Sequence, residues 1–528
     1  MPDPQPAPSA GVVAVIDIGS NSVRMVIAQV RPDGSVEVLE RMQRPVRLGH
    51  SSFLNGRLSQ QTINAAIAIL RDYRRIIDSY HVRKVRAVAT SAVREAANSD
   101  SFVDRAAIAA DIDIEIIEGA EESRLTVSAV REDLKGVFDI NKGPALIVEI
   151  GGGSGLVTVL ENGVIASSES YNLGSIRLQE LLGTSQEPPE RAVDLLRHHI
   201  DNVVAVMRRT MPIQGVDHFV AIGGDARFAA QQIGKPANDL AGKPSNGAAD
   251  VFLVTARKFN NFVRECSLHS AEELARTYGL PFANAETVVP ALLAYQALLQ
   301  ASRGKQMIVS SVSMRDGLLL DMARYVTGRE DPALAESIIQ SAEAVGERYR
   351  YDEKHAHQVS ALAVRLFDEL KPEHRLAPRY RLLLQVAGLL HEIGGYVSSR
   401  AHHKHSGYLI ANSSIFGMRR DEIEICAQVA RYHRRSPPRP SHREYLMLTR
   451  EQRVVVSKLA AILRVADALD RGHAQQVTDF VIERRADELL VYISGATDLS
   501  LERRAIARKG DLFEEAYGLR VNVEEDRR

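Results

Sequence analysis

The stretch from Ala145 to Val159 places the strongest constraint on the fold: it reads Ala-Leu-Ile-Val-Glu-Ile-Gly-Gly-Gly-Ser-Gly-Leu-Val-Thr-Val. Two apolar runs rich in β-branched residues flank the glycines, a pattern that predicts the strands of a buried hairpin. The glycines remove every Cβ from the turn, so backbone N–H groups can converge on an anion, and Ser154 adds a hydroxyl donor. Glu149 ends the first strand, where its carboxylate could hold a divalent cation against that anion. A plain hairpin with a flexible turn is the alternative.

The same pattern occurs near the N-terminus, between Gly11 and Ile27. An apolar strand, Asp17, an isoleucine and a small polar turn lead into another apolar strand, which predicts an internal duplication. Two similar halves would each present a carboxylate and a phosphate-sized turn, so a cleft between them could grip one ligand from both sides. The turns supply candidate phosphate-binding residues: Gly19, Ser20, Asn21 and Ser22 in the first half, and Gly151, Gly152, Gly153 and Ser154 in the second.

The composition is that of an ordinary soluble protein. At 528 residues the chain is long enough for about three domains of roughly 150 residues each. Hydrophobic residues make up 45% and charged residues 25% of the chain, and the net charge is −1. Because the chain as a whole does not attract polyanions, any anion site must be local.

The cysteines and the N-terminus favour a cytoplasmic protein. Cys266 and Cys426 stand alone, without the spacing of metal ligands, which indicates a reducing compartment. Residues 1–10 lack the basic start and apolar core of a signal peptide and are predicted to be a disordered tail. No apolar run approaches the roughly 20 residues that span a bilayer. We expect no membrane or nucleic-acid partner, and we expect a homodimer.

Further candidate residues lie at the junctions between strands and helices. Arg94 falls in a first helical turn, where a lone cation is disfavoured, so a docked anion would explain it; a solvated surface arginine is the alternative. Glu121 and Glu122 are adjacent and cannot share a helix face, so one is expected to point into a cleft and the other into water. Gly223 and Gly224 separate a strand from a helix, a shape suited to phosphate at the helix N-terminus.

The order of the elements indicates where the domains divide. Strands alternate with helices up to about residue 328, which predicts an α/β architecture, and long helices dominate afterwards. We expect two α/β domains, 11–135 and 136–328, and a helical domain, 329–528, with a small α+β end.

The helical domain contains clusters of histidine and arginine. The histidines are His355, His357, His391, His402, His403, His405 and His433. The segment from Arg431 to Arg453 holds seven arginines and two glutamates, with Pro437 and Pro438 among them. Because prolines stiffen the segment, it could guide a long polyanion with these residues: Arg434, Arg435 and Arg439. A solvated loop is the alternative.

Five motifs occur in order: Asp17-Ile-Gly-Ser-Asn-Ser, Ala89-Thr-Ser-Ala-Val-Arg-Glu-Ala, Gly119-Ala-Glu-Glu-Ser-Arg-Leu, Glu149-Ile-Gly-Gly-Gly-Ser and Ile222-Gly-Gly. With them the chain resembles, over nearly its whole length, the exopolyphosphatase and guanosine pentaphosphate phosphohydrolase (Ppx/GppA) family. The resemblance implies two ribonuclease H-like domains of the actin and sugar-kinase superfamily, with the site in the cleft between them. It also implies an all-α C-terminal domain similar to the HD phosphohydrolases.

The resemblance also implies roles for single residues. Asp17 matches the family's metal-and-water aspartate, Arg94 its phosphate arginine and Glu122 its general base. The phosphate loops match Gly19 through Ser22, Gly151 through Ser154, and Gly223 with Gly224. Mg²⁺ held by Asp17 and Glu149 would neutralise the phosphate, while Glu122 orients and deprotonates the attacking water.

The sequence departs from the family at two positions of the metal site. Glu149 stands where the family usually has aspartate, and its longer side chain shifts a metal outward. Leu156 stands where the family usually has an acidic residue, so one metal-associated carboxylate is missing. These departures leave the metal count open.

The helical domain has its own departure. His355, His391, His433 and Asp467 fall in the order of an HD metal site, but Glu392 replaces the aspartate that gives the motif its name. The resemblance implies a non-catalytic domain that lengthens the substrate channel. Since histidines are good transition-metal ligands, an active second centre is the alternative.

The sequence thus predicts an Mg²⁺-dependent exopolyphosphatase that releases orthophosphate from inorganic polyphosphate. Hydrolysis of guanosine pentaphosphate, an alarmone of the stringent response, is the alternative within the same class. A non-catalytic sensor of polyphosphate or alarmone is a further alternative, motivated by Leu156. A kinase is disfavoured, because the sequence reveals no adenine pocket.

Overall fold

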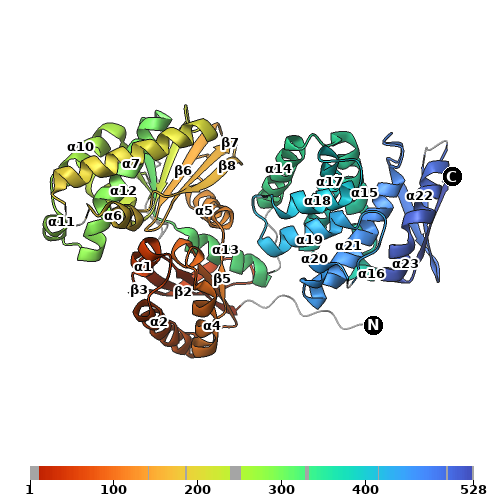
Figure 1. Ribbon diagram of the computed structural model, residues 1–528, viewed down its shortest axis with the longest axis horizontal. Helices are drawn as coiled ribbons and strands as arrows, with labels where there is room; N and C mark the ends of the chain where they lie inside the picture. The colour runs from red at the N-terminus through yellow and green to blue at the C-terminus, as the bar shows by residue number, and fades with distance from the viewer. Residues whose placement is uncertain are drawn as a thin grey trace. The chain divides into compact units, whose positions relative to one another are not determined.

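The structure is a computed structural model that describes residues 11–140, 142–184, 187–237, 251–327, 332–413, 415–439, 441–494 and 498–525. The described residues fall into two compact units, one up to Arg329 and one from Glu330 on (Figure 1). The predicted tail, residues 1–10, lies outside the described residues.

The first lobe of the first unit is built on a sheet with the order β3-β2-β1-β4-β5. Its strands are β1 (Gly11–Ile18), β2 (Ser22–Val30), β3 (Val36–Pro45), β4 (Lys84–Ala89) and β5 (Ile114–Ile116). β1 pairs with β2, and β2 with β3, in antiparallel fashion, whereas β1, β4 and β5 run parallel. The short turn between β1 and β2 therefore lies at the same end of the sheet as the loops that follow β4 and β5.

The second lobe repeats this topology. Its sheet has the order β10-β11-β12-β9-β6-β7-β8, in which β8-β7-β6-β9-β12 corresponds to the whole first sheet. The strands are β6 (Pro144–Ile150), β7 (Gly155–Glu161), β8 (Val164–Tyr171), β9 (His218–Ile222), β10 (Lys235–Pro236), β11 (Phe252–Thr255) and β12 (Gln306–Ser310). β6 and β7 are antiparallel, and β6, β9 and β12 are parallel. Both the predicted glycine hairpin and the predicted duplication are confirmed.

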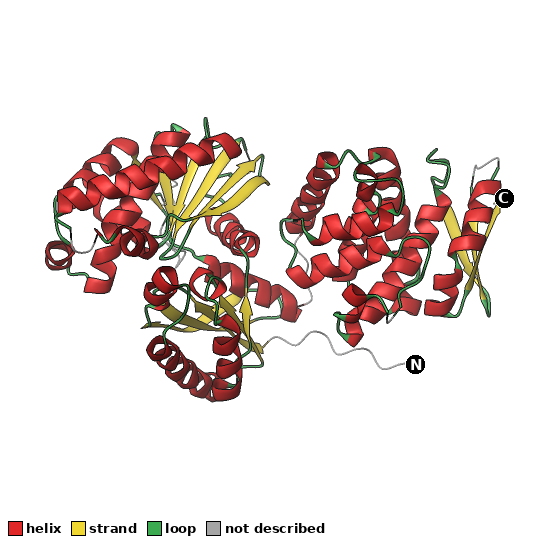
Figure 2. Cartoon of the chain, in the orientation of Figure 1, coloured by secondary structure: helices red, strands yellow, loops and turns green. Residues whose placement is uncertain are grey.

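Helices cover both sheets (Figure 2). The helices of the first lobe are α1 (Leu48–Asn55), α2 (Gln60–Ser79), α3 (Ser91–Arg94), α4 (Ser99–Ala110) and α5 (Gly119–Leu134). Those of the second are α6 (Ser175–Leu182), α7 (Pro189–Thr210), α8 (Gly224–Ile233), α10 (Ala256–Cys266), α11 (Ala271–Tyr278), α12 (Phe282–Ser302) and α13 (Met314–Thr327). Ser59 caps α2 as predicted, since its side chain accepts from the N–H of Thr62.

Two helices cross between the lobes. α13 follows the second lobe, yet Leu318 and Met322 pack on Val13 and Val15 of the first sheet. α5 belongs in sequence to the first lobe, yet residues on its second half pack on the second sheet: Val127, Val130 and Leu134. The predicted division at residue 135 therefore follows the chain, whereas the hydrophobic cores exchange one helix each.

The second unit is mostly helical. Its helices are α14 (Pro332–Arg348), α15 (Glu353–Glu369), α16 (Lys371–His374), α17 (Arg379–Leu390), the 3₁₀ turn η2 (Ile393–Tyr396), α18 (His402–Ala411), α19 (Arg420–Arg431), α20 (Arg443–Leu446), α21 (Arg450–Leu469), α22 (Ser500–Lys509) and α23 (Asp511–Tyr517). α21 runs through the core, with Val455, Leu459, Ile462 and Ala466 buried. No helix among the described residues is long and apolar enough to cross a membrane.

The second unit is not all-α. It also contains the sheet β13-β14-β15, built from β13 (Phe480–Arg484), β14 (Glu488–Ile493) and β15 (Arg520–Glu525). The expected α+β end corresponds to this sheet, but β15 was not predicted. Val521 and Val523 alternate with polar residues in β15 and are buried, the period of a half-buried strand. The likeness to HD phosphohydrolases stays a prediction.

The crossing of α5 and α13 depends on a glycine. A Cβ on Gly317 would overlap the backbone carbonyl of Leu125. We expect Gly317→Ala to lower the free energy of unfolding by about 2 kcal/mol or more, because backbone atoms have no rotamer with which to move aside. Urea denaturation would measure this loss. Gly395→Ala is the control, since no atom lies within 4 Å of its added Cβ. Equal stability of the two variants would contradict the packing described.

Candidate active site

The first unit contains a cleft of about 320 Å³ between its two lobes. It is lined by the β1–β2 turn and the start of α3 on one side, and by the β6–β7 turn and the start of α8 on the other. The predicted site residues that line it are Asp17, Gly19, Ser20, Asn21, Ser22, Glu122, Glu149, Gly151, Gly152, Gly153, Ser154, Gly223 and Gly224. The duplicated turns thus face one common space.

The glycines allow the two phosphate loops to touch. A Cβ on Gly153 would overlap the hydroxyl of Ser91 and crowd that of Ser20, and those two hydroxyls lie 3.3 Å apart. A Cβ on Gly174, which precedes α6, would overlap the backbone of Gly153. The glycines are therefore needed for close packing between the lobes as well as for exposing backbone N–H groups.

The β6–β7 turn directs N–H groups into the cleft. The carbonyl of Gly151 accepts from the N–H of Ser175, and that of Gly152 from the N–H of Ile176, both at 2.9 Å. Because C=O and N–H point in opposite directions across a trans peptide, the N–H groups of Gly152 and Gly153 face away from α6. Within the described residues neither has an acceptor, so both are available to an anion.

Asp17 and Glu149 occupy equivalent positions, each one residue before the end of its strand. Asp17 lies opposite Arg24 in the β1–β2 ladder, with Arg24 Nη1 at 3.9 Å from its Oδ2. Glu149 lies opposite Leu156 and accepts a hydrogen bond of 2.8 Å from Thr126. Burial raises the pKa of Glu149, the Thr126 bond opposes that rise, and the charge of Asp17 adds to it. The duplication therefore pairs one carboxylate with a cation and the other with an apolar side chain.

Glu122 lies in the first turn of α5 and lines the cleft. Burial raises its pKa to about 7; the charge of Arg94 opposes the rise, and those of Glu149 and Asp17 add to it. A carboxyl group with this pKa exchanges its proton near neutral pH, as a general base must. Its neighbour Glu121 does not face water as expected: it is buried and accepts from Arg124 at 2.7 Å.

Arg94 is absent from the cleft lining and lies behind Glu122. Its Nη1 donates to Glu122 Oε1 and to the carbonyl of Ile117, both at 2.5 Å. It ends the short helix α3. In this structure Arg94 holds the carboxylate predicted to be the base, and its role as a phosphate ligand stays a prediction.

Other charged residues of the site were not identified from the sequence. Arg24, Asp225 and Arg227 line the cleft, and Arg315 lies beside its Ser313–Met314 wall. Nε of Arg24 and of Arg315 are buried without a hydrogen-bond partner among the described residues, which leaves both free for an anion. Burial lowers the pKa of Arg315, and of Arg227 together with the charge of Arg315.

Asp225 follows the glycine pair in the first turn of α8. Burial raises its pKa to about 6, and a hydrogen bond of 3.1 Å from Thr287 opposes the rise. A signal was present in the sequence, since an acidic residue directly after Gly223-Gly224 reaches the same space as the glycines.

The comparisons with known proteins agree with this geometry. Residues 12–326 match the model of the "Ppx/GppA phosphatase family", and residues 339–506 match "Ppx/GppA phosphatase, domain III". The chain belongs to the Ppx/GppA phosphatase family. It is therefore an enzyme, a phosphatase, as the sequence predicted.

Similar proteins carry names of both predicted kinds. A guanosine-5'-triphosphate,3'-diphosphate pyrophosphatase of Photobacterium profundum is 24% identical over 479 residues, 89% of each chain. One of Vibrio atlanticus is 25% identical over 428 residues, 81% of each chain. A solved exopolyphosphatase from Cytophaga hutchinsonii has a TM-score of 0.52 and 21% identity over 60% of this chain and 99% of that chain. This last likeness confirms the predicted two-lobed α/β core.

The pair formed by Arg94 and Glu122 predicts a pH effect on phosphatase activity. A base is active when ionised, so kcat/KM should fall about tenfold per pH unit below the pKa of Glu122, about 7. Arg94→Gln removes a charge that lowers this pKa, and the acid limb should move to higher pH. Glu122→Gln should lose the limb and roughly 10²–10⁴ in rate.

Arg86→Gln is the matched control, because Arg86 pairs with Glu121 at 3.1 Å rather than with Glu122. Its acid limb should stay in place. An unmoved limb in Arg94→Gln, or an intact limb in Glu122→Gln, would refute the assignment of the base.

Proposed function

We propose that this protein is an exopolyphosphatase, which hydrolyses the terminal phosphoanhydride bond of inorganic polyphosphate and releases orthophosphate. The observation that carries the proposal is a buried carboxyl group with a pKa of about 7, Glu122, in a cleft lined by phosphate-binding groups from both lobes. These groups are backbone N–H groups, serine hydroxyls and arginines, the donors that suit a phosphoryl group.

The reaction follows from the arrangement. Glu122 accepts a proton from water, the water oxygen bonds to the terminal phosphorus, and the bridging P–O bond breaks, leaving the shortened chain with the electron pair. Arg24, Arg227 and the N–H groups of Gly152 and Gly153 bind the oxygens of the transferred phosphoryl group. Arg94 positions Glu122 through their hydrogen bond of 2.5 Å.

The cleft fits a divalent cation. Asp17, Glu149 and Glu122 line one space, and their charges raise one another's pKa where a shift is found, as expected of carboxylates gathered without a counterion. Carboxylate oxygens suit Mg²⁺, which we propose is held by Asp17 and Glu149. When bound, it would neutralise phosphate charge. Leu156 offers no ligand, and Arg24 beside Asp17 supplies a fixed positive charge.

The lining favours polyphosphate over a nucleotide. Phe228 is the sole aromatic side chain among the described lining residues, and its ring packs on Phe262 and Tyr278 with centroids 5.9 and 5.2 Å away. It therefore offers little free face on which a guanine could stack. Guanosine pentaphosphate remains the second candidate substrate, because the relatives that match along most of their length are named for that nucleotide.

Parallel assays separate these functions. Phosphate release from long-chain polyphosphate, tripolyphosphate and guanosine pentaphosphate would be measured with Mg²⁺ and with chelator. We expect polyphosphate to give the highest kcat/KM and chelator to abolish release. Asp17→Asn and Glu122→Gln should be inactive on every substrate while still binding polyphosphate. Release from the nucleotide alone would establish the second candidate, and binding without release by the wild type would establish a sensor.

The predicted guide for long chains can be tested in the second unit. Arg435 and Arg439 are exposed, whereas Arg434 is half-buried with its Nη1 3.1 Å from Nε2 of His402. Arg434 therefore does not point freely outward as expected. We predict that Arg435→Gln with Arg439→Gln weakens binding of long polyphosphate and reduces its salt dependence, because fewer counterions are released.

Tripolyphosphate hydrolysis should barely change in that double variant. Arg504→Gln with Arg508→Gln is the control, since it removes equal charge from two exposed positions of α22. A similar effect of both double variants on long chains would reduce the guide to general electrostatics.

A further inference from the structure

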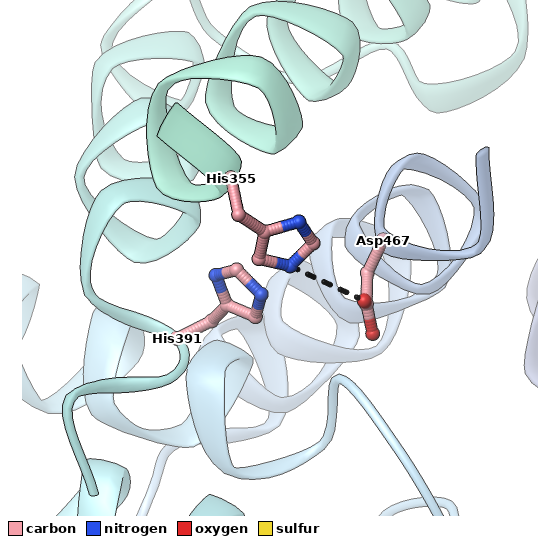
Figure 3. A group of neighbouring side chains, drawn as sticks. All are labelled: His355, His391 and Asp467. Carbon is pink, nitrogen blue, oxygen red and sulfur yellow. Dashed lines mark ion pairs between the residues drawn. The ribbon is translucent and has the colours of Figure 1, made fainter. Parts of the chain in front are cut away.

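A cluster of buried histidines and carboxylates lies in the second unit, outside the cleft. His355 from α15, His391 at the end of α17 and Asp467 from α21 are each at most 1% exposed. One nitrogen or oxygen of each lies within 4.8 Å of the other two. Figure 3 shows the two rings and the carboxylate converging, with the 3.8 Å ion pair between His355 Nε2 and Asp467 Oδ1 dashed.

Hydrogen bonds orient the two rings. Nδ1 of His355 lies 2.8 Å from Oδ2 of Asp470, and Nδ1 of His391 lies 2.7 Å from the carbonyl of Gly388. Carbonyl and carboxylate oxygens are acceptors, so each Nδ1 carries the proton, and Nε2 of a neutral ring presents a lone pair. A carboxylate or carbonyl behind the ring is the usual support of a metal-binding histidine.

The atoms at the centre lack partners. Nε2 of His355, Nε2 of His391 and Oδ1 of Asp467 are buried without a hydrogen bond among the described residues. The other oxygen of Asp467 accepts from Lys509. Lone pairs gathered in a dry space are costly unless a cation joins them. A proton on His355 would not suffice, since 3.8 Å is too long for a hydrogen bond and His391 would stay unpaired.

Glu392 lies at the partly open side of the cluster, with a quarter of its side chain exposed. Its Oε2 is 4.0 Å from Nε2 of His355, and its Oε1 is 3.5 Å from Nε2 of His402. Glu392, His402 and His433 form an adjoining group whose ligand atoms also lie within 4.8 Å of one another. Nδ1 of His433 lies 2.6 Å from the carbonyl of Ala430, so its Nε2 is oriented in the same way.

We propose that the second unit binds a divalent transition-metal ion through His355, His391 and Asp467, with Glu392 closing the site towards solvent. Imidazole with carboxylate suits Zn²⁺, Mn²⁺ or Fe²⁺, whereas Mg²⁺ prefers oxygen ligands alone. All these residues lie in α15, α17, the N-terminal flank of η2 and α21 of the second unit, so the site is independent of the proposed hydrolysis in the first. The ion would join four separate elements of this unit.

Metal titration of the full-length protein tests the proposal. The protein would be stripped with chelator, dialysed into excess Mg²⁺ to fill oxygen-ligand sites, and titrated with Co²⁺ and Zn²⁺ by visible absorption and calorimetry. We expect at least one equivalent of Co²⁺ with the visible bands of a nitrogen-ligated ion. A second equivalent that disappears in His402→Asn would place another ion at the adjoining group.

Two variants and two controls decide whether the ligands are correct. His391→Asn should weaken Co²⁺ binding at least tenfold, and Glu392→Gln, at the open edge, provides a variant that keeps the buried core intact if His391→Asn fails to fold. His374→Asn is the matched control: His374 is also buried in the second unit, but its nitrogens contact the carbonyl of Phe367 and the N–H of Leu376. Glu149→Gln controls for the cleft of the first unit.

The expected pattern is unchanged binding in both controls and weakened binding in both variants, with a metal-dependent rise in Tm for the wild type that His391→Asn lacks. Absence of Co²⁺ binding in excess Mg²⁺ would overturn the proposal. Equal binding by wild type, His391→Asn and Glu392→Gln would also overturn it, as would loss of binding in Glu149→Gln alone.

Discussion

The close contact between two backbone turns is the constraint on which the first unit depends. Gly153 lies so near Ser20 and Ser91 that no larger residue fits. This contact places the N–H groups of one lobe beside the hydroxyls of the other, so an anion meets both at once. It also closes off the ends of the sheets, and the resulting burial raises the pKa values of Glu122 and Glu149. Anion binding and proton transfer thus share one steric origin.

The exchanged helices make the position of Glu122 depend on both lobes. α5 carries Glu122 in its first turn and packs its second half on the sheet of the other lobe. Arg124, two residues further along α5, donates to Glu121 at 2.7 Å and to Asp321 of α13 at 3.0 Å. These charges are buried, so losing one partner would leave an uncompensated charge. The base is therefore held by the crossing itself, not by a loop.

The local motifs were predictable because each is contained in a short segment. An acidic residue, a glycine turn and two apolar runs specify a hairpin with its carboxylate at the turn, which is why Asp17, Glu149 and the glycine loops all line the cleft. Arg24 and Arg315 were missed because arginines are usually exposed, and only the packing of distant elements buries them. The pairing of Arg94 with Glu122 was missed for a related reason: it joins residues 28 positions apart, and the sequence offered phosphate as the simpler partner for Arg94.

The second unit shows the same limit at the level of single atoms. The order of the histidines was visible in the sequence, but the carbonyl behind His391, which decides the direction of its lone pair, is set by the end of α17. Sequence reasoning identifies residue types, whereas tertiary structure determines which atoms they present.

The pairing of Asp17 with Arg24 and of Glu149 with Leu156 gives the cleft a polarity that its duplicated backbone lacks. Linear polyphosphate reads identically from either end and carries no direction of its own. A symmetric site with two equal halves could bind such a chain in two equivalent ways, and only one would bring a terminal phosphorus to Glu122. Unequal side chains on equal strands remove that degeneracy, so the protein alone decides which way the chain threads.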